Sequence, residues 1–383
     1  MSFGLINNST LHTPNFKLVK HSTLNKRGFY IKMSKFLINK YQSLDVYTPG
    51  EQPKDMEYVK LNTNESPYPP SEGVLAAVSA EEVSKLNLYP DPECRQLREK
   101  IALLYDVNAE NVFLSNGSDD ILNFSFMAFC SDECEAVFPN ISYGFYKVFG
   151  DLHKVKYTEA QLKEDFSIDV NDYINVGKTV VIANPNAPTG LMLTLDEIEM
   201  IVSSNPDNVV VIDEAYIDFG GTTCVPLTKK YDNLLVVQTF SKSRSMAGAR
   251  LGFAIGSKAL IEDLNRIKYS TNPYNINRLT LAAGVAAVDD NDYYMDCCRK
   301  IIETREYSKK RLAELGFTYL DSATNFIFAK SDKISGEDYY KKLKQNGVLV
   351  RHFSNPAISD YVRITVGTKE QMDRLFEVTQ TLF

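Results

Sequence analysis

The sequence predicts an α/β fold with a parallel β-sheet, and three continuous apolar runs carry this prediction. The runs lie at residues 180–183, 209–212 and 234–237. Continuous rather than alternating hydrophobicity is typical of strands buried on both faces, as in parallel sheets covered by helices. A helix is predicted between the first two runs, over residues 195–203, because Thr194 can cap it and Glu197 completes a capping box. Strand, helix and strand make a βαβ unit, which is typical of the α/β class.

The C-terminal part of the chain predicts a smaller α+β domain. A long polar helix is expected over residues 294–315, and Gly316 would end it. A final helix is expected to begin near Lys369. Between these helices, short strands are predicted at residues 326–328, 348–350 and 361–364.

The composition disfavours several classes of partner and cofactor. The 383 residues carry a net charge of −7, which gives no hint of a nucleic-acid or membrane partner and suits a cytoplasmic protein. No apolar run approaches the roughly 20 residues that cross a bilayer. The six cysteines are scattered without a repeated CxxC and the four histidines are far apart, so we expect reduced thiols and no metal site.

Residues 1–32 differ in composition from the rest of the chain. They contain no Asp or Glu and are rich in Asn, Ser, Thr and Lys, with Arg27 as the one arginine. We expect a disordered tail or a misplaced start site, since Met33 opens a more ordinary sequence; a transit peptide is the alternative. This segment is therefore left out of the fold prediction.

Polar and charged residues follow each of the three predicted strands. Asn184 and Asn186 follow the first strand, and Asp213 follows the second. Lys242 follows the third strand, in a stretch that also holds Arg250. Ligands of open parallel sheets bind beyond the carboxyl ends of the strands, so these side chains are expected to meet at one edge. Burying an aspartate or a lysine alone is costly, and a bound cofactor that satisfies both would explain their placement.

The motifs around these residues resemble those of fold-type-I aminotransferases. In chain order they are Asn-x-Pro-Thr-Gly at 186–190, Asp-Glu-Ala-Tyr at 213–216, Ser-Lys at 241–242 and Ala-Gly-x-Arg at 247–250. Four further stretches are similar to those of histidinol-phosphate aminotransferases, at residues 47–53, 61–67, 89–91 and 362–368. Each motif alone is weak, but a chance match of all of them in this order, over about residues 42–383, is remote.

The resemblance implies a homodimeric enzyme that uses pyridoxal 5'-phosphate. Residues 74–290 would form a large domain with a mostly parallel seven-stranded sheet covered by helices, and residues 291–383 the smaller α+β domain. Residues 33–73 would join the small domain and the dimer partner. The implied reaction exchanges an amino group between L-histidinol phosphate and 2-oxoglutarate in histidine biosynthesis. Threonine-phosphate decarboxylases and aromatic amino-acid aminotransferases have the same fold and stay open as alternatives.

By this resemblance, three residues would carry the chemistry. Lys242 would form a Schiff base with the cofactor aldehyde and later move the substrate proton, and both tasks require a neutral amine near pH 7. Asp213 would keep the pyridine nitrogen protonated, so that the ring draws electrons from the substrate. Tyr216 would donate to the cofactor's phenolic oxygen. Asn186 would contact the same oxygen and lie beside the substrate, and Asn184 stays open as the alternative.

A phosphate cradle is expected where a polar stretch precedes an apolar helix predicted at residues 121–128. Helix N-termini offer free N–H groups and a partial positive charge, and glycine lets the backbone approach closely. We predict that the cradle consists of Gly117, Ser118, Asp119, Ser241 and Arg250. Asp119 and Asp120 are anions near another anion, so they are expected to point away or to contribute only their backbone. Arg244 competes with Arg250 for the phosphate, and the family pattern favours Arg250.

The remaining site residues are assigned by resemblance alone. Tyr143 would stack on the cofactor ring, and Tyr89 would reach the phosphate bound in the other subunit. Arg363 would hold the anionic group of the substrate, which is a phosphate in this branch of the family. Arg351 would assist it, and Tyr47 would cover the substrate.

Departures from the family pattern leave the choice of substrate open. They follow the expected cofactor lysine, where Ser243, Arg244 and Ala249 replace the residues usual in the family. Two rivals of other classes are disfavoured. A sensing domain of a transcription regulator would need a helix-turn-helix module, and residues 1–40 lack its pattern. A nucleotide-binding enzyme is disfavoured because neither GxGxxG nor GxxxxGK occurs.

Overall fold

The computed structural model describes residues 22–24, 30–32, 34–45 and 47–382. The chain divides into two compact units between residues 45 and 46. In the first unit, β1 (Ser22–Leu24) pairs antiparallel with β2 (Tyr30–Lys32), and the 3-10 helix η1 (Asn39–Tyr41) follows. The rest of the tail predicted at 1–32 lies outside the described residues. All predicted site residues belong to the second unit.

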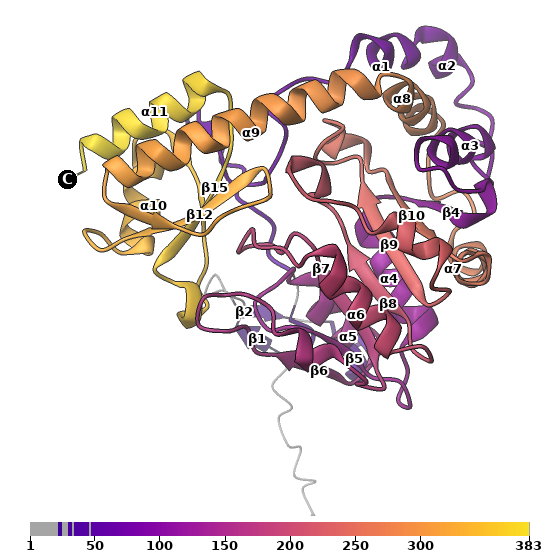
Figure 1. Cartoon of the computed structure of the whole chain (residues 1–383). Helices are drawn as coiled ribbons and strands as arrows, with labels where there is room; N and C mark the ends of the chain where they lie inside the picture. The colour runs from indigo at the N-terminus through magenta and orange to yellow at the C-terminus, as the bar shows by residue number, and fades with distance from the viewer. Residues whose placement is uncertain (1–21, 25–29, 33, 46, 383) are drawn as a thin grey trace, which may run out of the picture. The chain divides into compact units, whose positions relative to one another are not determined.

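The second unit contains a seven-stranded sheet with the order β4-β10-β9-β8-β7-β5-β6 (Figure 1). The strands are β4 (Val112–Ser115), β5 (Ala136–Pro139), β6 (Tyr157–Ala160), β7 (Thr179–Ala183), β8 (Val210–Asp213), β9 (Leu234–Thr239) and β10 (Gly252–Gly256). The five strands from β9 to β6 are parallel, whereas β10 runs antiparallel to both β9 and β4. The predicted mostly parallel seven-stranded sheet is therefore confirmed.

Helices cover both faces of this sheet, and the strands are apolar on both faces for that reason. In β7, Val180 and Ile182 belong to one hydrophobic cluster, and Val181 and Ala183 belong to another. The first cluster includes side chains of α3 (Arg95–Leu104), α6 (Leu195–Ser204) and α8 (Arg278–Asp289). The second includes side chains of α4 (Ser118–Phe129), α5 (Phe145–His153) and α7 (Lys258–Thr271). Burial on both faces explains the continuous apolar runs that predicted β7, β8 and β9.

The helix between β7 and β8 begins where the sequence predicts. Thr194 caps α6 through its side chain, and Glu197 completes the capping box. A capping box satisfies two of the N–H groups that lack partners within the helix. The helix extends one residue beyond the predicted range.

The C-terminal part forms the expected smaller α+β arrangement. A four-stranded antiparallel sheet has the order β11-β12-β15-β14. Its strands are β11 (Phe317–Tyr319), β12 (Phe326–Ser331), β14 (Arg351–His352) and β15 (Tyr361–Thr365). One hydrophobic cluster joins this sheet to three helices, α9 (Asn291–Glu314), α10 (Gly336–Gln345) and α11 (Lys369–Gln380). Figure 1 shows α9 and α11 side by side along it.

The N-terminal segment of the second unit is tied to this C-terminal part. Strand β3 (Val59–Lys60) pairs in parallel with β13 (Val348–Leu349). Leu61, which follows β3, is 1% exposed and belongs to the same cluster as α9, α10 and α11. The predicted domain boundaries at 73 and 290 stay predictions.

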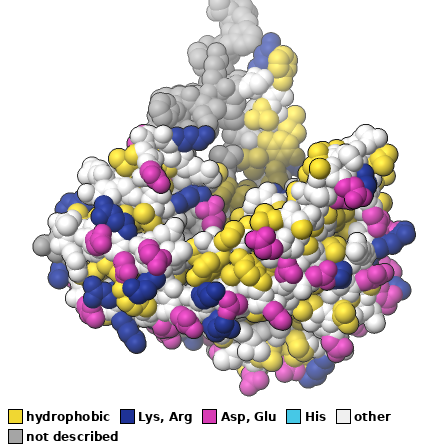
Figure 2. All heavy atoms as spheres, turned by 90° about the horizontal axis from the view of Figure 1, so that it is seen from above, with side chains coloured by type: hydrophobic (Ala, Val, Ile, Leu, Met, Phe, Trp, Pro, Cys, Tyr) yellow, Lys and Arg dark blue, Asp and Glu magenta, His cyan; other side chains and the backbone are white. Residues whose placement is uncertain are grey.

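The surface carries charges of both signs. Figure 2 shows Lys and Arg side chains interspersed with Asp and Glu side chains on the face in view. None of the helices in the described part of the chain combines the length and the apolar character that a membrane span requires.

Candidate active site

Lys242 follows β9 and meets two other parts of the chain. Its Nζ donates a hydrogen bond to the carbonyl oxygen of Thr63 at 3.3 Å. The same Nζ lies 5.7 Å from the centre of the Tyr216 ring. Lys242 is half-buried, whereas Ser241 and Ser243 on either side are buried. The N-terminal segment and the loop after β8 therefore converge on the lysine amine.

Asp213 ends β8 and is 4% exposed. The hydroxyl of Tyr146 donates to its Oδ2 at 2.9 Å, and the backbone N–H of Ala215 donates to its Oδ1 at 3.2 Å. Burial raises the pKa of Asp213 to about 6, and the two hydrogen bonds oppose that rise. Asp119 raises this pKa further and Lys242 lowers it, so both charges act on the Asp213 carboxyl.

Tyr216 is fixed by contacts with two distant segments. Its hydroxyl oxygen accepts a hydrogen bond from Nδ2 of Asn64 at 2.9 Å. The edge of its ring packs against Phe326 of β12, with 5.2 Å between ring centres. Asn64 was not predicted, although it lies in the family-like stretch 61–67. Its backbone adopts φ 55°, a left-handed conformation that asparagine tolerates better than most residues.

Asn184 and Asn186 lie in the loop after β7, and both are buried. The amide of Asn184 exchanges hydrogen bonds with the backbone of Leu193, so this side chain closes the loop. Asn186 accepts from the hydroxyl of Ser142 at 2.7 Å, next to Tyr143. Of the two alternatives, Asn186 is the one in contact with the segment that holds Tyr143.

The N-terminus of α4 forms a close-packed turn with the loop after β9. Gly117 is the N-cap of α4 and adopts φ 87°. A Cβ atom on Gly117 would lie 2.8 Å from Nη2 of Arg250, and one on Gly252 would lie 2.5 Å from the backbone nitrogen of Ser118. A side chain at either glycine would therefore fill the predicted cradle.

The side chains of the predicted cradle contact one another. Arg250 Nη2 donates to Oδ2 of Asp119 at 3.0 Å, and Arg250 Nη1 donates to Oγ of Ser241 at 3.4 Å. The competing Arg244 is buried, with its guanidinium 5.8 Å from the centre of the Tyr294 ring on α9. Arg250, and not Arg244, is thus the arginine in contact with the cradle residues.

The two aspartates at the start of α4 have different hydrogen-bond partners. Asp120 points away from the cradle, because Oδ2 accepts from Ser115 at 2.6 Å and from Asn275 at 2.9 Å. The Asp119 carboxylate does not point away; it binds Arg250 and accepts from the hydroxyl of Tyr143 at 2.6 Å. A positive guanidinium beside it stabilises a carboxylate that the expected phosphate alone would repel.

Aromatic side chains cluster at the start of α5. The Tyr143 ring lies 5.7 Å from Tyr146 and 6.4 Å from Tyr47, and Tyr47 stacks on Phe145 with 4.3 Å between ring centres. Burial raises the pKa of Tyr143 well above its usual value, and the Asp119 carboxylate adds to that rise. The phenol of Tyr143 therefore stays protonated at neutral pH and donates a hydrogen bond to Asp119.

Arg363 on β15 is held between two aromatic rings. Its guanidinium lies 5.3 Å from the centre of Phe326 and 5.8 Å from that of Phe353. Nη2 donates to the carbonyl oxygen of Asn62 at 3.3 Å, whereas the buried Nε has no hydrogen-bond partner among the described residues. Burial lowers the pKa of Arg363. A half-buried arginine whose Nε lacks a hydrogen-bond partner among the described residues is suited to binding an anion.

Arg351 and Tyr47 belong to the same neighbourhood. Burial raises the pKa of Tyr47, and the charges of Arg351 and then Arg363 oppose that rise. The Arg351 guanidinium donates to the carbonyl oxygens of Thr48 and Pro49 at 3.2 and 3.4 Å. The predicted substrate-binding residues are thus brought together with the segment that carries Tyr47.

Tyr89 does not join this cluster. Its side chain is 78% exposed, and its ring stacks on Tyr274 with 4.5 Å between centres. In the part of the chain that the structure describes, Tyr89 contacts none of the other predicted site residues. This position suits a residue whose predicted role lies in another subunit.

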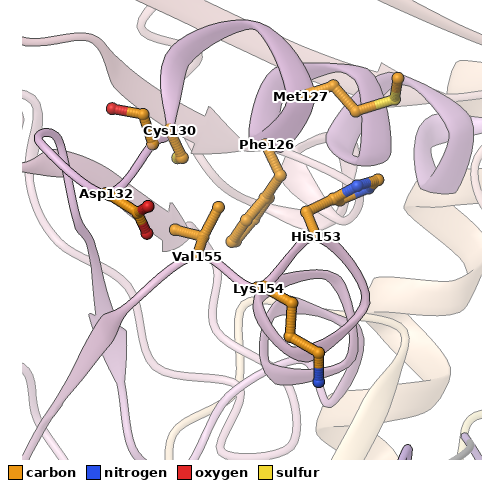
Figure 3. Close-up of a pocket in the computed structure, with 8 residues that line it drawn as sticks. Phe126, Met127, Cys130, Asp132, His153, Lys154 and Val155 are labelled. Carbon is orange, nitrogen blue, oxygen red and sulfur yellow. The ribbon is translucent and has the colours of Figure 1, made fainter. Parts of the chain in front are cut away.

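The surface hollow in Figure 3 is separate from the candidate site. It has a volume of about 360 Å³ and lies at the C-terminal ends of α4 and α5. It is lined by Phe126, Met127, Cys130, Ser131, Asp132, His153, Lys154 and Val155. The site residues stand at the opposite, N-terminal ends of these helices; a helix of 12 residues such as α4 is about 18 Å long.

Among the residues that contact the predicted site, Asn64 and Tyr146 were not singled out from the sequence. A weak signal existed for Tyr146, which follows Tyr143 by three residues, about one helical turn. For Asn64 the signal was the motif around it, without an indication of its partner.

Lysine, aspartate, tyrosine and arginine side chains meet at one edge of a parallel sheet. The sequence of the chain also matches a known family. Residues 56–378 match the family described as aminotransferase class I and II, and the chain belongs to this family. Among its relatives, the histidinol-phosphate aminotransferase of Brachyspira hyodysenteriae (strain ATCC 49526 / WA1) is 54% identical over 346 residues, which cover 90% of this chain and 98% of the relative. The histidinol-phosphate aminotransferase of Clostridium botulinum (strain Kyoto / Type A2) is 50% identical over 341 residues, 89% of this chain and 96% of the relative.

Solved structures confirm the fold. The histidinol-phosphate aminotransferase of Sinorhizobium meliloti, in complex with pyridoxal-5'-phosphate, superimposes with a TM-score of 0.81 and 21% identity, over 92% of this chain and 99% of that chain. The L-threonine-O-3-phosphate decarboxylase of Porphyromonas gingivalis superimposes with a TM-score of 0.75 and 20% identity, over 84% of this chain and 98% of that chain. Because both activities share the fold, the fold alone does not select between them.

Proposed function

We propose that this chain is a transaminase that transfers the amino group of L-histidinol phosphate to 2-oxoglutarate, in histidine biosynthesis. The products are imidazole-acetol phosphate and L-glutamate. The observation that carries the substrate is the 54% identity, over 90% of the chain, to a histidinol-phosphate aminotransferase. The cofactor is pyridoxal 5'-phosphate, on which the family depends.

The residues of the site fit this cofactor. Side chains at Gly117 or Gly252 would fill the turn at the start of α4, where backbone N–H groups and Arg250 would bind the phosphate. When bound, the cofactor supplies an aldehyde that takes up the amino group and a ring that accepts electrons from the substrate. Asp213 would hold the ring nitrogen, because a buried carboxylate stabilises a cation.

Lys242 would carry the proton. Its Nζ would take the proton from the amino-bearing carbon of the substrate and would deliver it to the carbon of the cofactor's aldehyde group. The Thr63 carbonyl, at 3.3 Å, accepts one Nζ hydrogen and so orients the amine. Tyr216 lies beneath the amine and would donate its hydroxyl hydrogen to the cofactor, since its oxygen already accepts from Asn64. Asn186 would contact the same cofactor oxygen.

Binding of the substrate's phosphate would fall to Arg363. Its unpaired Nε and its sequestered position between two rings favour a charge-assisted hydrogen bond, which is stronger away from water. Arg351 would add a second positive charge. Tyr47 would cover the substrate from the side of Phe145, on which it stacks.

A homodimer in the cytoplasm completes the proposal. The 78% exposed Tyr89 would reach the phosphate bound in the other subunit, and its stacking on Tyr274 holds it at the surface. The described cysteines are all free thiols, which suits a reducing compartment.

The test is a coupled assay of the purified chain with 2-oxoglutarate and one amino donor at a time. L-histidinol phosphate should give a kcat/KM at least about tenfold above phenylalanine, and threonine phosphate should release no carbon dioxide. Lys242→Ala should abolish turnover, whereas Lys229→Ala on the surface should not. Release of carbon dioxide from threonine phosphate, or turnover by Lys242→Ala at the wild-type rate, would contradict the proposal.

A further inference from the structure

The start of α5 contacts the cofactor site at two points. The hydroxyl of Tyr143 donates to Asp119 in the predicted cradle at 2.6 Å. The hydroxyl of Tyr146 donates to Asp213, the predicted partner of the ring nitrogen, at 2.9 Å. The cofactor ring is expected to stack on Tyr143, whereas Tyr146 has no role in the function proposed above.

Tyr146 is buried, and within the described part of the chain its hydroxyl has Asp213 as its one hydrogen-bond partner. The side chain is 0% exposed, and its ring packs against Phe138 at 5.8 Å and against Tyr143 at 5.7 Å. Burial raises the pKa of Tyr146 well above its usual value, and the Asp213 carboxylate adds to that rise. The phenol therefore stays protonated, so that its hydroxyl can donate the hydrogen bond to Asp213.

The Asp213 carboxylate depends on its donors because it has little contact with water. A buried carboxylate without hydrogen bonds takes up a proton, and a protonated acid no longer attracts a cation. Two groups donate to it, Tyr146 on Oδ2 and the Ala215 N–H on Oδ1. Among the charged groups near it, Lys242 favours the anion and Asp119 disfavours it.

We propose that Tyr146 is a positioning residue of the cofactor site, which fixes the orientation of the Asp213 carboxylate and keeps it charged. The inference rests on the proposed function, because it requires a cationic ring nitrogen opposite Asp213. Tyr146 would act through Asp213, to which it donates, and not directly on the substrate.

The test measures the affinity of the full chain for pyridoxamine 5'-phosphate by equilibrium dialysis between pH 5 and 9. This probe lacks the aldehyde, so its affinity does not depend on a covalent bond to Lys242. In the wild-type chain the affinity should fall on the acid side as Asp213 takes up a proton. In Tyr146→Phe, which keeps the ring and its packing, this fall should begin about one pH unit higher, so that the affinity near pH 6 drops by about fivefold and the loss approaches about tenfold near pH 5.

Control variants separate this effect from others. Asp213→Asn should lose the fall that belongs to Asp213 and keep the part due to the probe's phosphate. Adding Tyr146→Phe to Asp213→Asn should change nothing further, because the two residues act as one unit. Tyr339→Phe is the matched control, since Tyr339 is also fully buried and its hydroxyl lies 2.8 Å from Oγ1 of Thr379 in the smaller α+β part. It should bind the probe as the wild-type chain does.

The outcomes are distinguishable. A Tyr146→Phe profile that coincides with the wild type, or an additive double variant, overturns the inference and leaves the proposed function intact. A wild-type chain that does not bind the probe overturns the proposed function itself. If Tyr146→Phe does not fold, replacement of Tyr146 by 3-fluorotyrosine preserves the shape and strengthens the donor. The acid fall should then begin at a lower pH, and an unchanged or raised onset would refute the inference.

Discussion

Asn64 Nδ2 donates a hydrogen bond to the hydroxyl oxygen of Tyr216 at 2.9 Å, across 152 positions of sequence. Asn64 is 1% exposed, and its other polar groups are also engaged. Its Oδ1 accepts from the hydroxyl of Thr365 at 3.1 Å, and its carbonyl oxygen accepts from Asn325 at 3.0 Å. Thr365 ends β15, the strand that carries Arg363. Asn64 therefore connects the side chain expected beside the cofactor to the strand expected to bind the substrate.

This connection predicts that Asn64→Ala reduces both activity and stability. Tyr216 would lose the donor that directs its own hydroxyl hydrogen outward, so kcat/KM should fall by roughly tenfold. The free energy of unfolding should fall by about 1–3 kcal/mol, because buried partners lose their hydrogen bonds. Urea unfolding and initial-rate kinetics with L-histidinol phosphate measure the two effects.

Asn64→Gly is the matched control for the backbone. Asn64 has φ 55°, a conformation that glycine adopts freely and alanine does not. The glycine variant should therefore be more stable than the alanine variant while its activity falls as far. If Asn64→Gly is as active as the wild-type chain, the side chain does not orient Tyr216.

The contrast between β8 and β10 shows which parts of the sheet the sequence could predict. Residues 210–213 of β8 are all buried between two helical layers, and burial on both faces leaves a local signal, a continuous apolar run. Strand β10 begins and ends with glycine and lies antiparallel between β9 and β4. Its pairing with β4 joins residues more than a hundred positions apart, such as Gly252 and Ser115, and no local pattern encodes that pairing.

The same distinction applies to the site. Lys242, Asp213 and Arg250 could be singled out from the sequence because they stand at or after the ends of strands and in recognisable motifs, and their roles stay predictions. Tyr146 is one of 22 tyrosines, and its partner Asp213 lies 67 positions further along the chain. The Asp119 carboxylate was expected to avoid the cradle, because the sequence does not reveal that the guanidinium of Arg250 lies beside it.

Arg250→Ala should weaken cofactor binding through the phosphate alone. The Arg250 guanidinium contacts Asp119 and Ser241 at the start of α4, where the phosphate is expected. Loss of one charge-assisted contact should raise the dissociation constant of pyridoxamine 5'-phosphate by about 10- to 100-fold. Pyridoxamine without phosphate is the control ligand and should bind the variant and the wild-type chain equally. An equal loss for both ligands would show that Arg250 does not bind the phosphate.

Arg363→Lys should raise the KM for L-histidinol phosphate by at least about tenfold and change kcat less. Lysine keeps the positive charge but lacks the planar fork that lies between Phe326 and Phe353 and offers the unpaired Nε. Steady-state kinetics at saturating 2-oxoglutarate measure both parameters. Arg374→Lys, an exposed arginine paired with Glu377 on α11, is the control and should leave KM unchanged. A KM that stays within twofold in Arg363→Lys would place the substrate's phosphate elsewhere.

Glu214 should make the stability of the chain decrease between about pH 4.5 and 7. It is 1% exposed, and burial raises its pKa to about 7, although Thr223, the Cys224 N–H and Gln238 donate to it. The unfolded chain ionises this carboxyl near the usual pKa of glutamate, so between the two values the folded chain holds more protons. Stability is then fully present below the unfolded pKa and is lost as the pH rises through 7, by up to about 3 kcal/mol.

Glu214→Gln should remove most of that loss. Asp213, with a pKa raised to about 6, contributes in the same direction below pH 6, so the interval between pH 6 and 7 belongs mainly to Glu214. Urea unfolding at pH 5, 6, 7 and 8 measures the free energy of unfolding of both chains. The value of the variant minus that of the wild type should become more positive as the pH rises, and the variant should have gained stability relative to the wild type at pH 8. Parallel curves across this range would mean that the folded chain does not hold the Glu214 proton, because the three donors then suffice to keep the buried anion charged.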